Sequence, residues 1–224
     1  MRRPPATSNF AYSFGPGPVT PAIRILIAVN VAGFLATLIV PSLTLVLGLR
    51  PADIIERRFA WQPLTYMFLH GGIFHILFNM LALWMFGVEL ERMWGSRFFT
   101  RYYFAAGIGA ALTTMILSLV PLPFADQLFY SLTIGASGAV YGILLAYALY
   151  FPNRPIYLYF VFPIPAKYFV MIMGGIAFYS SLSDAGGVAN ATHLGGLLVG
   201  YLLLKGGDLH PMNELQYRWL RWKI

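Results

Sequence analysis

Four polar side chains stand within apolar stretches of this 224-residue sequence: His75, Asn79, Ser137 and His193. A serine hydroxyl is a poor nucleophile unless a neighbouring base takes its proton. A histidine can take that proton and later return it to a leaving amine. Ser137 and His193 therefore suggest acyl transfer, with the serine as nucleophile and the histidine as base. The alternative is that Ser137 only bonds to its own helix among small residues that favour helix packing.

Acyl transfer also requires hydrogen-bond donors for the oxyanion that develops on the substrate carbonyl. His75 and Asn79 stand four residues apart, so they share one face of a predicted helix, and both can donate. The backbone N–H of Ser137, at the start of another predicted helix, is a third donor. Alternatively, His75 and Asn79 only tie helices together, through hydrogen bonds worth about 1 kcal/mol or less each.

Small residues surround the candidate nucleophile and base. Glycines recur at four-residue spacing in two predicted helices, as Gly138 and Gly142 and as Gly196 and Gly200. Such faces allow two helix backbones to come nearly into contact, which would bring His193 to Ser137. Tyr141 lies one turn after Ser137, where its ring could pack against the histidine; packing in an ordinary aromatic core explains it equally well. The nearby acid Asp184 lies in a glycine-rich loop, so we expect a dyad rather than a triad.

The composition places these residues in a membrane protein. Hydrophobic residues make up 58% of the chain and charged residues only 10%, and the mean hydropathy is +0.68. Because an ordinary globular domain is about a quarter charged, so few charges exclude a soluble, disordered, collagen-like or coiled-coil protein. The chain has no cysteine, which excludes disulfides, a thiolate nucleophile and a cysteine zinc site. We therefore expect an integral membrane protein.

Six apolar stretches are candidates for spanning helices, which need about 20 residues. They are residues 23–40, 75–90, 98–120, 134–151, 167–183 and 188–204. The predicted fold is an all-α membrane protein, a six-helix bundle over residues 21–205. Residues 1–20 are predicted to form a flexible cytoplasmic leader, because they are rich in proline, glycine and serine. Residues 206–224 are predicted to form a cytoplasmic or interfacial tail.

The distribution of basic residues predicts the orientation. Of the 15 lysines and arginines, Arg50, Arg57 and Arg58 lie between the first two predicted spans, and twelve lie on the opposite side. The positive-inside rule then places both termini in the cytoplasm and residues 48–74 outside. Because the basic residues flank apolar stretches, we expect no nucleic-acid partner. The aromatic-rich outer segment is either an ordinary loop or an interfacial element partly embedded in the bilayer, and we expect the second.

The motifs, taken in order, resemble those of the rhomboid intramembrane serine proteases, from about residue 50 to residue 205. They are Gly135-Ala136-Ser137-Gly138 followed by Tyr141, His75-Ile76-Leu77-Phe78-Asn79, the stretch from His193 through Gly196 to Gly200, and Glu91-Arg92-Met93-Trp94-Gly95-Ser96. The resemblance implies that Ser137 is the nucleophile and His193 the base. It implies that His75, Asn79 and the backbone N–H of Ser137 bind the oxyanion and that Tyr141 packs against His193. Gly135, Gly138, Gly196 and Gly200 would support this site.

The resemblance also implies a substrate class and a location. The substrates would be single-span membrane proteins, cut in or near the outer part of their transmembrane helix. The chain would be the six-span prokaryotic type, in a bacterial or archaeal cell membrane, with transmembrane substrates and the bilayer as its partners. It would need no cofactor and no metal ion. The fifth predicted span and its outer loop would be candidates for a mobile gate.

Other functions fit the sequence less well. A catalytically inactive relative would act as a membrane chaperone or trafficking protein, but such proteins lose the serine or the histidine, and this chain has both Ser137 and His193. A small transporter would use buried polar groups as a path, yet the sequence lacks the repeat that many transporters show. The chain also lacks the His-Glu-x-x-His pattern of zinc proteases and the Gly-x-Gly-Asp motif of intramembrane aspartyl proteases.

Overall fold

The computed structural model describes residues 15–121, 124–158, 162–181 and 187–206. The helices are α1 (Pro21–Ile39), α2 (Leu43–Leu47), α3 (Pro51–Arg57), α4 (Gln62–Thr65), the short 3₁₀ helix η1 (Tyr66–Phe68), α5 (Ile73–Trp94), α6 (Ser96–Leu119), α7 (Ala125–Tyr130), α8 (Ser137–Tyr150), α9 (Ala166–Ser181) and α10 (Gly187–Lys205). The strands are β1 (Pro155–Leu158) and β2 (Phe162–Pro165). The chain is therefore mostly helical, as the sequence predicted.

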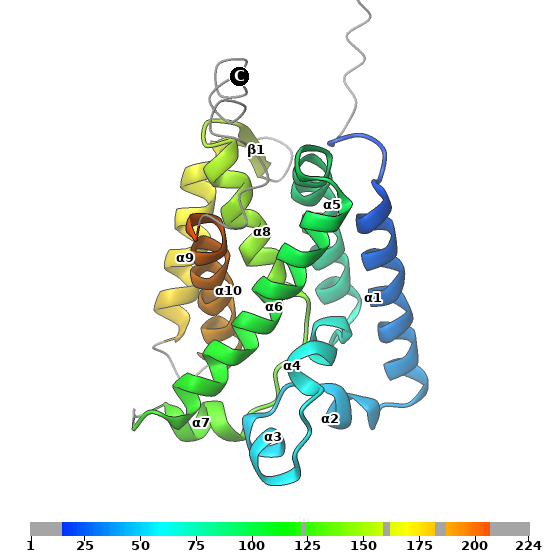
Figure 1. The fold of residues 1–224 in the computed structure, drawn as a ribbon, viewed down its shortest axis with the longest axis vertical. Helices are drawn as coiled ribbons and strands as arrows, with labels where there is room; N and C mark the ends of the chain where they lie inside the picture. Colours follow the sequence, from blue (N-terminus) through cyan, green and yellow to red (C-terminus); the bar gives the residue numbers. More distant parts are fainter. Residues whose placement is uncertain (1–14, 122–123, 159–161, 182–186, 207–224) are drawn as a thin grey trace, which may run out of the picture.

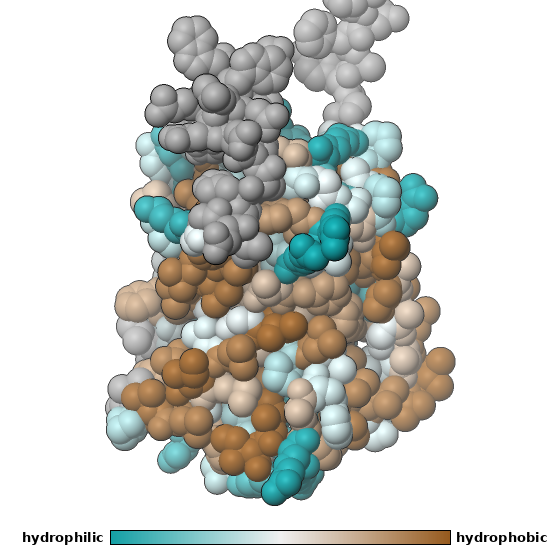
Figure 2. All heavy atoms as spheres, in the orientation of Figure 1, coloured by the Kyte–Doolittle hydropathy of each residue, from teal (hydrophilic) through white to brown (hydrophobic). Residues whose placement is uncertain are grey.

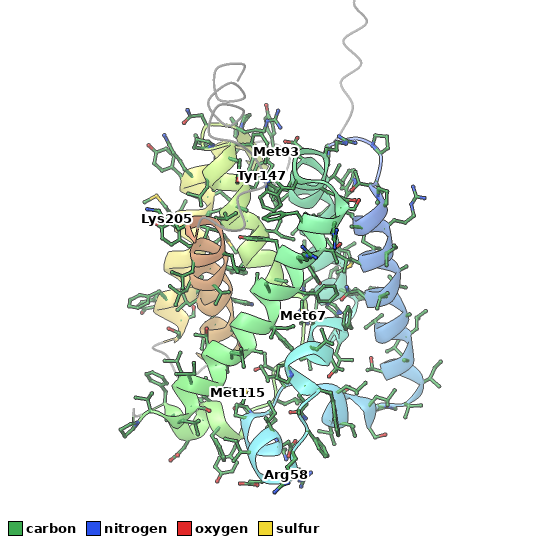
Figure 3. All side chains as sticks on the ribbon, in the orientation of Figure 1. Arg58, Met67, Met93, Met115, Tyr147 and Lys205 are labelled. Atoms are coloured by element: carbon green, nitrogen blue, oxygen red, sulfur yellow. The ribbon has the colours of Figure 1, made fainter. Side chains whose placement is uncertain are left out.

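The long helices form a bundle whose two ends differ in structure. The short helices α2, α3, α4 and α7 lie together at one end, while strand β1 and the start of α1 lie at the other (Figure 1). Within the described residues, α1, α5 and α6 are long and apolar enough to cross a bilayer, and α8 is a shorter apolar helix. Arg58 lies at the end with the short helices, and Met93 and Tyr147 lie towards the opposite end (Figure 3).

The outside of the bundle is apolar where a water-soluble protein would be polar. Large hydrophobic side chains are exposed along the long helices, such as Ile39 on α1, Phe78 on α5 and Tyr179 on α9. Brown, hydrophobic atoms cover the middle of the visible face in Figure 2, and the teal, hydrophilic atoms gather towards its two ends. A surface of this kind is stable in lipid and would aggregate in water, so the protein is an integral membrane protein.

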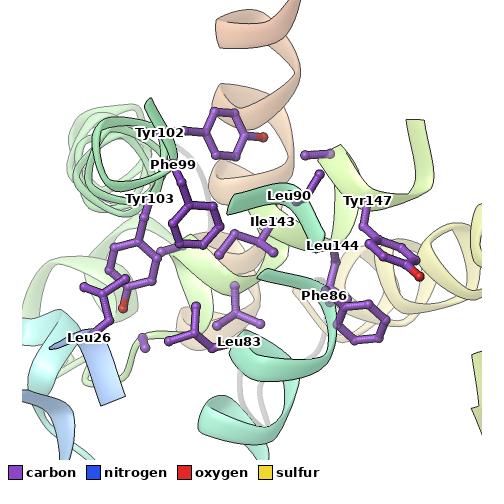
Figure 4. Packing of buried hydrophobic residues seen from close by; sticks show 14 of the residues in the cluster. Leu26, Leu83, Phe86, Leu90, Phe99, Tyr102, Tyr103, Ile143, Leu144 and Tyr147 are labelled. Carbon is purple, nitrogen blue, oxygen red and sulfur yellow. The ribbon is translucent and has the colours of Figure 1, made fainter. Parts of the chain in front are cut away.

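Aromatic residues of α6 fill the centre of the bundle. Phe99 and Tyr103 are fully buried and Tyr102 nearly so. They pack with residues of α1, α5 and α8, including Leu26, Leu83 and Ile143 (Figure 4). Because all of these elements bury side chains against α6, the position of α8 is set by its packing on this central helix.

Two parts of the structure differ from the predicted helices. The turn after α8 contains an antiparallel hairpin in which Pro155 pairs with Pro165 and Leu158 with Phe162, so the all-α prediction was incomplete. Prolines stand at the start of β1, inside β2 and at the end of β2, and they exclude a helix there. The two strands tolerate them because each strand has a free edge. Helix α8 begins at Ser137, whereas the predicted span began three residues earlier. Gly135 has φ +127°, a conformation that a helix cannot contain.

Glu91 joins the starts of two helices. Its carboxylate accepts hydrogen bonds from the backbone N–H groups of Ala22 and Ile23 at the start of α1. It also accepts from the hydroxyls of Thr20 and Ser96, the latter at the start of α6. Orphan N–H groups at a helix start favour a negative charge, so this carboxylate caps α1 and, through the Ser96 hydroxyl, links it to the start of α6.

The described end of the predicted leader lies against α5. Arg92 donates to the backbone carbonyls of Pro16 and Pro18, and the Trp84 indole N–H donates to that of Gly17. Gly17 has φ +89°, which only glycine adopts easily. Residues 1–14 and the predicted tail from residue 207 lie outside the described residues.

The segment between α1 and α5, which was predicted to lie outside and is called the outer segment for that reason, is folded into short helices held by buried side chains. Gln62 is fully buried, and its side chain accepts from the backbone N–H of Arg50 (3.0 Å) and donates to the carbonyl of Val46 (3.3 Å). The hydroxyl of Thr65 donates to the carbonyl of Leu47 (2.6 Å). Asp53 is buried and pairs with Arg50 (2.8 Å). The segment therefore has a defined structure and can position neighbouring residues.

Candidate active site

Ser137 is the first residue of α8, and a tight loop presents it there. The backbone N–H of Gly135 donates to the carbonyl of Tyr66 (2.9 Å), and Thr133 forms a β-bridge with Leu49. The outer segment thus holds the chain extended up to the residue at which the helix begins. As a result, the side chain of Ser137 and the free N–H groups of the first helical turn lie together.

His193 on α10 meets this serine. Its Nε2 lies 2.8 Å from Oγ of Ser137. The ring of Tyr141 is stacked on the imidazole, with centroids 4.3 Å apart and planes inclined by 4°. Nδ1 of His193 is buried and has no hydrogen-bond partner among the described residues. A neutral imidazole that accepts the serine proton at Nε2 carries its own proton at Nδ1, and no carboxylate of the described residues accepts a hydrogen bond from it.

Glycines allow α10 to come this close to α8, as the sequence predicted. A Cβ atom added at Gly196 would lie 2.0 Å from the carbonyl oxygen of Gly138, and one added at Gly200 would lie 3.0 Å from Cα of Gly142. A side chain at either position would separate the two helices. The glycines therefore set the distance between the elements that carry Ser137 and His193.

A threonine pair that the sequence reading did not identify connects α10 to α6. The hydroxyls of Thr114 and Thr192 lie 2.8 Å apart, and both side chains are buried. Thr192 directly precedes His193, so this bond restricts the rotation of α10 about its axis. Thr192 lies on the helix that carries the glycine face. Its partner Thr114 is distant in the sequence, so only the fold identifies the pair.

His75 faces the reacting side of Ser137. A Cβ atom added at Gly135 would lie 2.7 Å from Nε2 of His75 and 3.6 Å from Oγ of Ser137. Because a Cβ there would overlap the ring, Nε2 of His75 lies directly against Gly135, on the backbone that presents Ser137. A donor this near the nucleophile is within reach of a carbonyl that the serine attacks.

Asn79 lies one turn further along α5 and is buried. Its Nδ2 donates to the backbone carbonyl of His75 (2.9 Å), which is a bond within its own helix. This bond does not link two helices, which was the alternative role predicted for Asn79. A side-chain amide has two N–H groups, so one remains for another acceptor.

His70 is a further polar residue beside the site, and the sequence did not single it out. It is 4% exposed, and its ring packs edge-on against that of His75, with centroids 4.9 Å apart. Burial, together with the neighbouring His75, lowers the pKa of His70 to about 4. His70 stands five residues before His75, with the Gly71–Gly72 pair between them. This short spacing was the available sign in the sequence that the two rings lie close together.

Tyr66 is a second residue that was not identified. Its side chain is fully buried, and its hydroxyl donates to the carbonyl of Gly107 on α6 (2.8 Å). The same oxygen lies beside Gly138, where an added Cβ would approach it to 2.9 Å. Tyr66 therefore contacts the loop that carries Ser137 through its side chain as well as through its backbone carbonyl. Aromatic residues in a predicted outer loop gave no sign of this role.

The arrangement places a nucleophile, a base and a donor close together. Ser137, His75 and His193 are half-buried, so each keeps some exposed surface. Among the residues that the structure describes, no three histidine, cysteine, aspartate or glutamate side chains are placed to hold a metal ion. Asp184, which was predicted to be a loop residue, lies outside the described residues. The geometry suits attack by a hydroxyl on a carbonyl.

Comparison with known proteins connects this geometry to a family. The family described as "Rhomboid domain" matches residues 57–206. Rhomboid protease GluP of Bacillus subtilis is 37% identical over 156 residues, which are 69% of this chain and 27% of that protein. Rhomboid protein 1, mitochondrial, of Saccharomyces cerevisiae is 35% identical over 138 residues (60% and 38%). Rhomboid protease AarA of Providencia stuartii is 29% identical over 154 residues (64% and 54%).

The matched regions cover only part of these relatives, from 27% to 54% of their lengths. In this chain the family match covers two thirds of the sequence, from α3 to the end of α10. It includes the loop with Ser137, the helix with His75 and Asn79, and the helix with His193. The chain belongs to the rhomboid family.

Proposed function

We propose that this protein is an intramembrane serine endopeptidase that cuts single-span membrane proteins in or near their transmembrane helix. The single observation that carries the proposal is the 2.8 Å contact between Oγ of Ser137 and Nε2 of His193. Hydroxyl groups in apolar helices usually bond back to their own helix, so a contact with a stacked imidazole on another helix is specific. The relatives named as rhomboid proteases support the same activity.

In the proposed reaction, His193 takes the proton of Ser137 at Nε2 as the serine oxygen attacks the substrate carbonyl. The negative charge that develops on the carbonyl oxygen is stabilised by Nε2–H of His75, by the free N–H of Asn79 and by the backbone N–H of Ser137. His193 then gives the proton to the leaving amine, and a water molecule releases the acyl group by the reverse steps. The stacked ring of Tyr141 keeps the imidazole plane fixed throughout.

The proposed orientation places the end with α2, α3 and α4 outside and both termini in the cytoplasm. All six long helices, α1, α5, α6, α8, α9 and α10, would cross the bilayer. Leu45, Trp61 and Leu64 are exposed on the outer segment, which supports an element partly embedded in the outer leaflet. The site would then open towards the outer leaflet of a bacterial or archaeal cell membrane.

The proposed path of the substrate runs between α5 and α9. Helix α9 buries only Ala166, Val170 and Ala177, and its other described side chains are half-buried or exposed. On α5, Phe74 and Phe78 are exposed beside His75. A helix with so small a buried face can move at low cost, so α9 is a candidate gate. A crosslink between α5 and α9 tests this, because undiminished cleavage in the locked protein would contradict gating.

The direct test of the activity uses purified protein in liposomes with a reporter substrate that has one transmembrane helix. The wild type should release a cleaved product, and the Ser137→Ala and His193→Ala variants should not, while their thermal unfolding stays close to that of the wild type. A chelator should not change the rate. Cleavage by Ser137→Ala at the wild-type rate would contradict the mechanism, and an inert but folded wild type would favour a chaperone or trafficking role.

A further inference from the structure

Two imidazoles lie near Ser137, and either could in principle act as the base. Nε2 of His193 contacts the serine hydroxyl directly, at 2.8 Å. Nε2 of His75 lies against Gly135, two residues before the serine. In a neutral imidazole one nitrogen donates and the other accepts, and the hydrogen bond at one nitrogen decides the role of the other. The partner of the second nitrogen of His75 therefore decides what its Nε2 can do.

That partner is a backbone amide. The N–H of Gly71 points at Nδ1 of His75, with 3.3 Å between the two nitrogens. An amide N–H can only donate, so Nδ1 must be the unprotonated, accepting nitrogen. The proton of the neutral ring is then at Nε2, which lies against Gly135 and near Ser137. With the opposite tautomer, two N–H groups would face each other at Gly71, and a lone pair would face the developing oxyanion.

We propose that the backbone amide of Gly71 is a positioning group that holds His75 as the Nε2–H tautomer. His75 is thereby an oxyanion donor and His193 the base. This inference rests on the proposed protease function. It explains why the two histidines have different roles. Gly71 itself does not touch the substrate; it acts through the ring of His75.

The loop that carries Gly71 is held firmly enough for this task. The backbone N–H of Leu69 donates to the carbonyl of Tyr66 (3.2 Å), and that same carbonyl accepts from Gly135. His70, which is buried, packs its ring against His75 at an interplanar angle of 70°. The stretch from Tyr66 to Gly71 therefore contacts both the loop that carries Ser137 and the ring of His75. One outer segment positions the nucleophile and the donor relative to each other.

The surroundings of Gly71 provide a matched pair of variants. A Cβ atom added at Gly71 would lie 3.7 Å from a methyl group of Ile134 and 3.9 Å from Nδ1 of His75, which are ordinary contacts. Gly71→Ala therefore fits and keeps the amide. Gly71→Pro removes the N–H at the same position. A Cβ atom at the neighbouring Gly72 would meet no atom within 4 Å, and its φ of 169° is open to any residue, so Gly72→Ala controls for stiffening of the loop.

The experiment is nitrogen-15 NMR of protein labelled only at its four histidines, in detergent micelles, with His75→Gln used to assign the His75 signals. Correlations from the ring protons to the two ring nitrogens show which nitrogen carries the proton. The wild type, Gly71→Ala and Gly72→Ala should show His75 protonated at Nε2. Gly71→Pro should show a mixture of tautomers and should lower kcat in proportion to the fraction of His75 that no longer carries its proton at Nε2, about twofold for an equal mixture.

A wild-type His75 protonated at Nδ1 would overturn the inference, even if the protein cleaves its substrate normally. If Gly71→Pro does not fold, the wild-type spectrum alone still decides the tautomer. Failure of the proposed function has a different signature, since the wild type would then be inert whichever tautomer His75 adopts.

Discussion

The carbonyl oxygen of Gly138 on α8 lies so close to Gly196 on α10 that a Cβ at Gly196 would approach it to 2.0 Å. No rotamer change can relieve this contact, because both atoms belong to the main chain or are fixed to it. The helices that carry Ser137 and His193 can therefore approach this closely only because Gly196 has no side chain.

Gly196→Ala should push α10 away from α8 and separate the dyad. A misplacement of about 1 Å at a reacting group can cost about 10²-fold in rate, so we expect cleavage to fall at least about 100-fold. Overpacking should also lower the unfolding free energy by about 1–3 kcal/mol. Gly175→Ala is the matched control, since nothing lies within 4 Å of a Cβ there. Equal cleavage by the two variants would show that the close approach does not set the dyad geometry.

Gly135→Ala should displace His75 from its position beside Ser137. The added methyl group would lie 2.7 Å from Nε2 of His75, and the φ of +127° is one that L residues rarely adopt. We expect cleavage to be lost and the melting temperature to fall. Gly72→Ala, where a Cβ meets no atom within 4 Å, should leave the melting temperature unchanged. A Gly135→Ala enzyme that cleaves like the wild type would mean that cleavage does not depend on the position of His75 beside Gly135.

Asn79→Ala should reduce turnover less than the loss of the serine or the histidine, because other oxyanion donors remain. We expect kcat to fall between about tenfold and about 100-fold, at or below the usual loss for one such donor. Leu77→Ala, which removes an exposed side chain from the same helix, is the control. Steady-state cleavage in liposomes measures both. Complete inactivity of Asn79→Ala with normal folding would instead point to an essential role in binding or orienting the substrate.

His70 should make the stability of the protein depend on pH. Its pKa is lowered from 6.5 to about 4 in the folded protein, chiefly by burial. The unfolded chain therefore binds a proton more readily than the folded one, and stability is lost as the pH falls from about 6.5 towards 4. His70→Phe should unfold with a weaker dependence on pH over this range, measured as the thermal midpoint in detergent. Identical pH profiles for the two proteins would contradict this assignment.

The positions of the long helices could be predicted because each apolar stretch ends at a residue that stops a helix or marks an interface. Residues 75–90 and 98–120 were predicted as spans, and the structure has α5 from Ile73 to Trp94 and α6 from Ser96 to Leu119. The meeting of Ser137 with His193 was also predictable, since glycines four residues apart on both helices indicate where they pack.

Other features depend on contacts between distant residues and could not be predicted. The start of α8 at Ser137 depends on the bond from Gly135 to Tyr66, 69 positions earlier in the chain. The apolar residues after Arg154 fit a strand and a helix equally well, so the hairpin was missed. The role of His70 follows from its burial against His75, and nothing in a single sequence distinguishes it from a histidine in an exposed loop.

The proposed reaction requires that Ser137 is a nucleophile activated by His193. Labelling with a fluorophosphonate, which reacts with activated serines, tests it most directly in wild-type protein, Ser137→Ala and His193→Ala. We predict labelling of the wild type, none of Ser137→Ala, and little of His193→Ala, because without the base the hydroxyl is a poor nucleophile. Equal labelling of the wild type and Ser137→Ala, or no labelling of folded wild-type protein, would contradict the account.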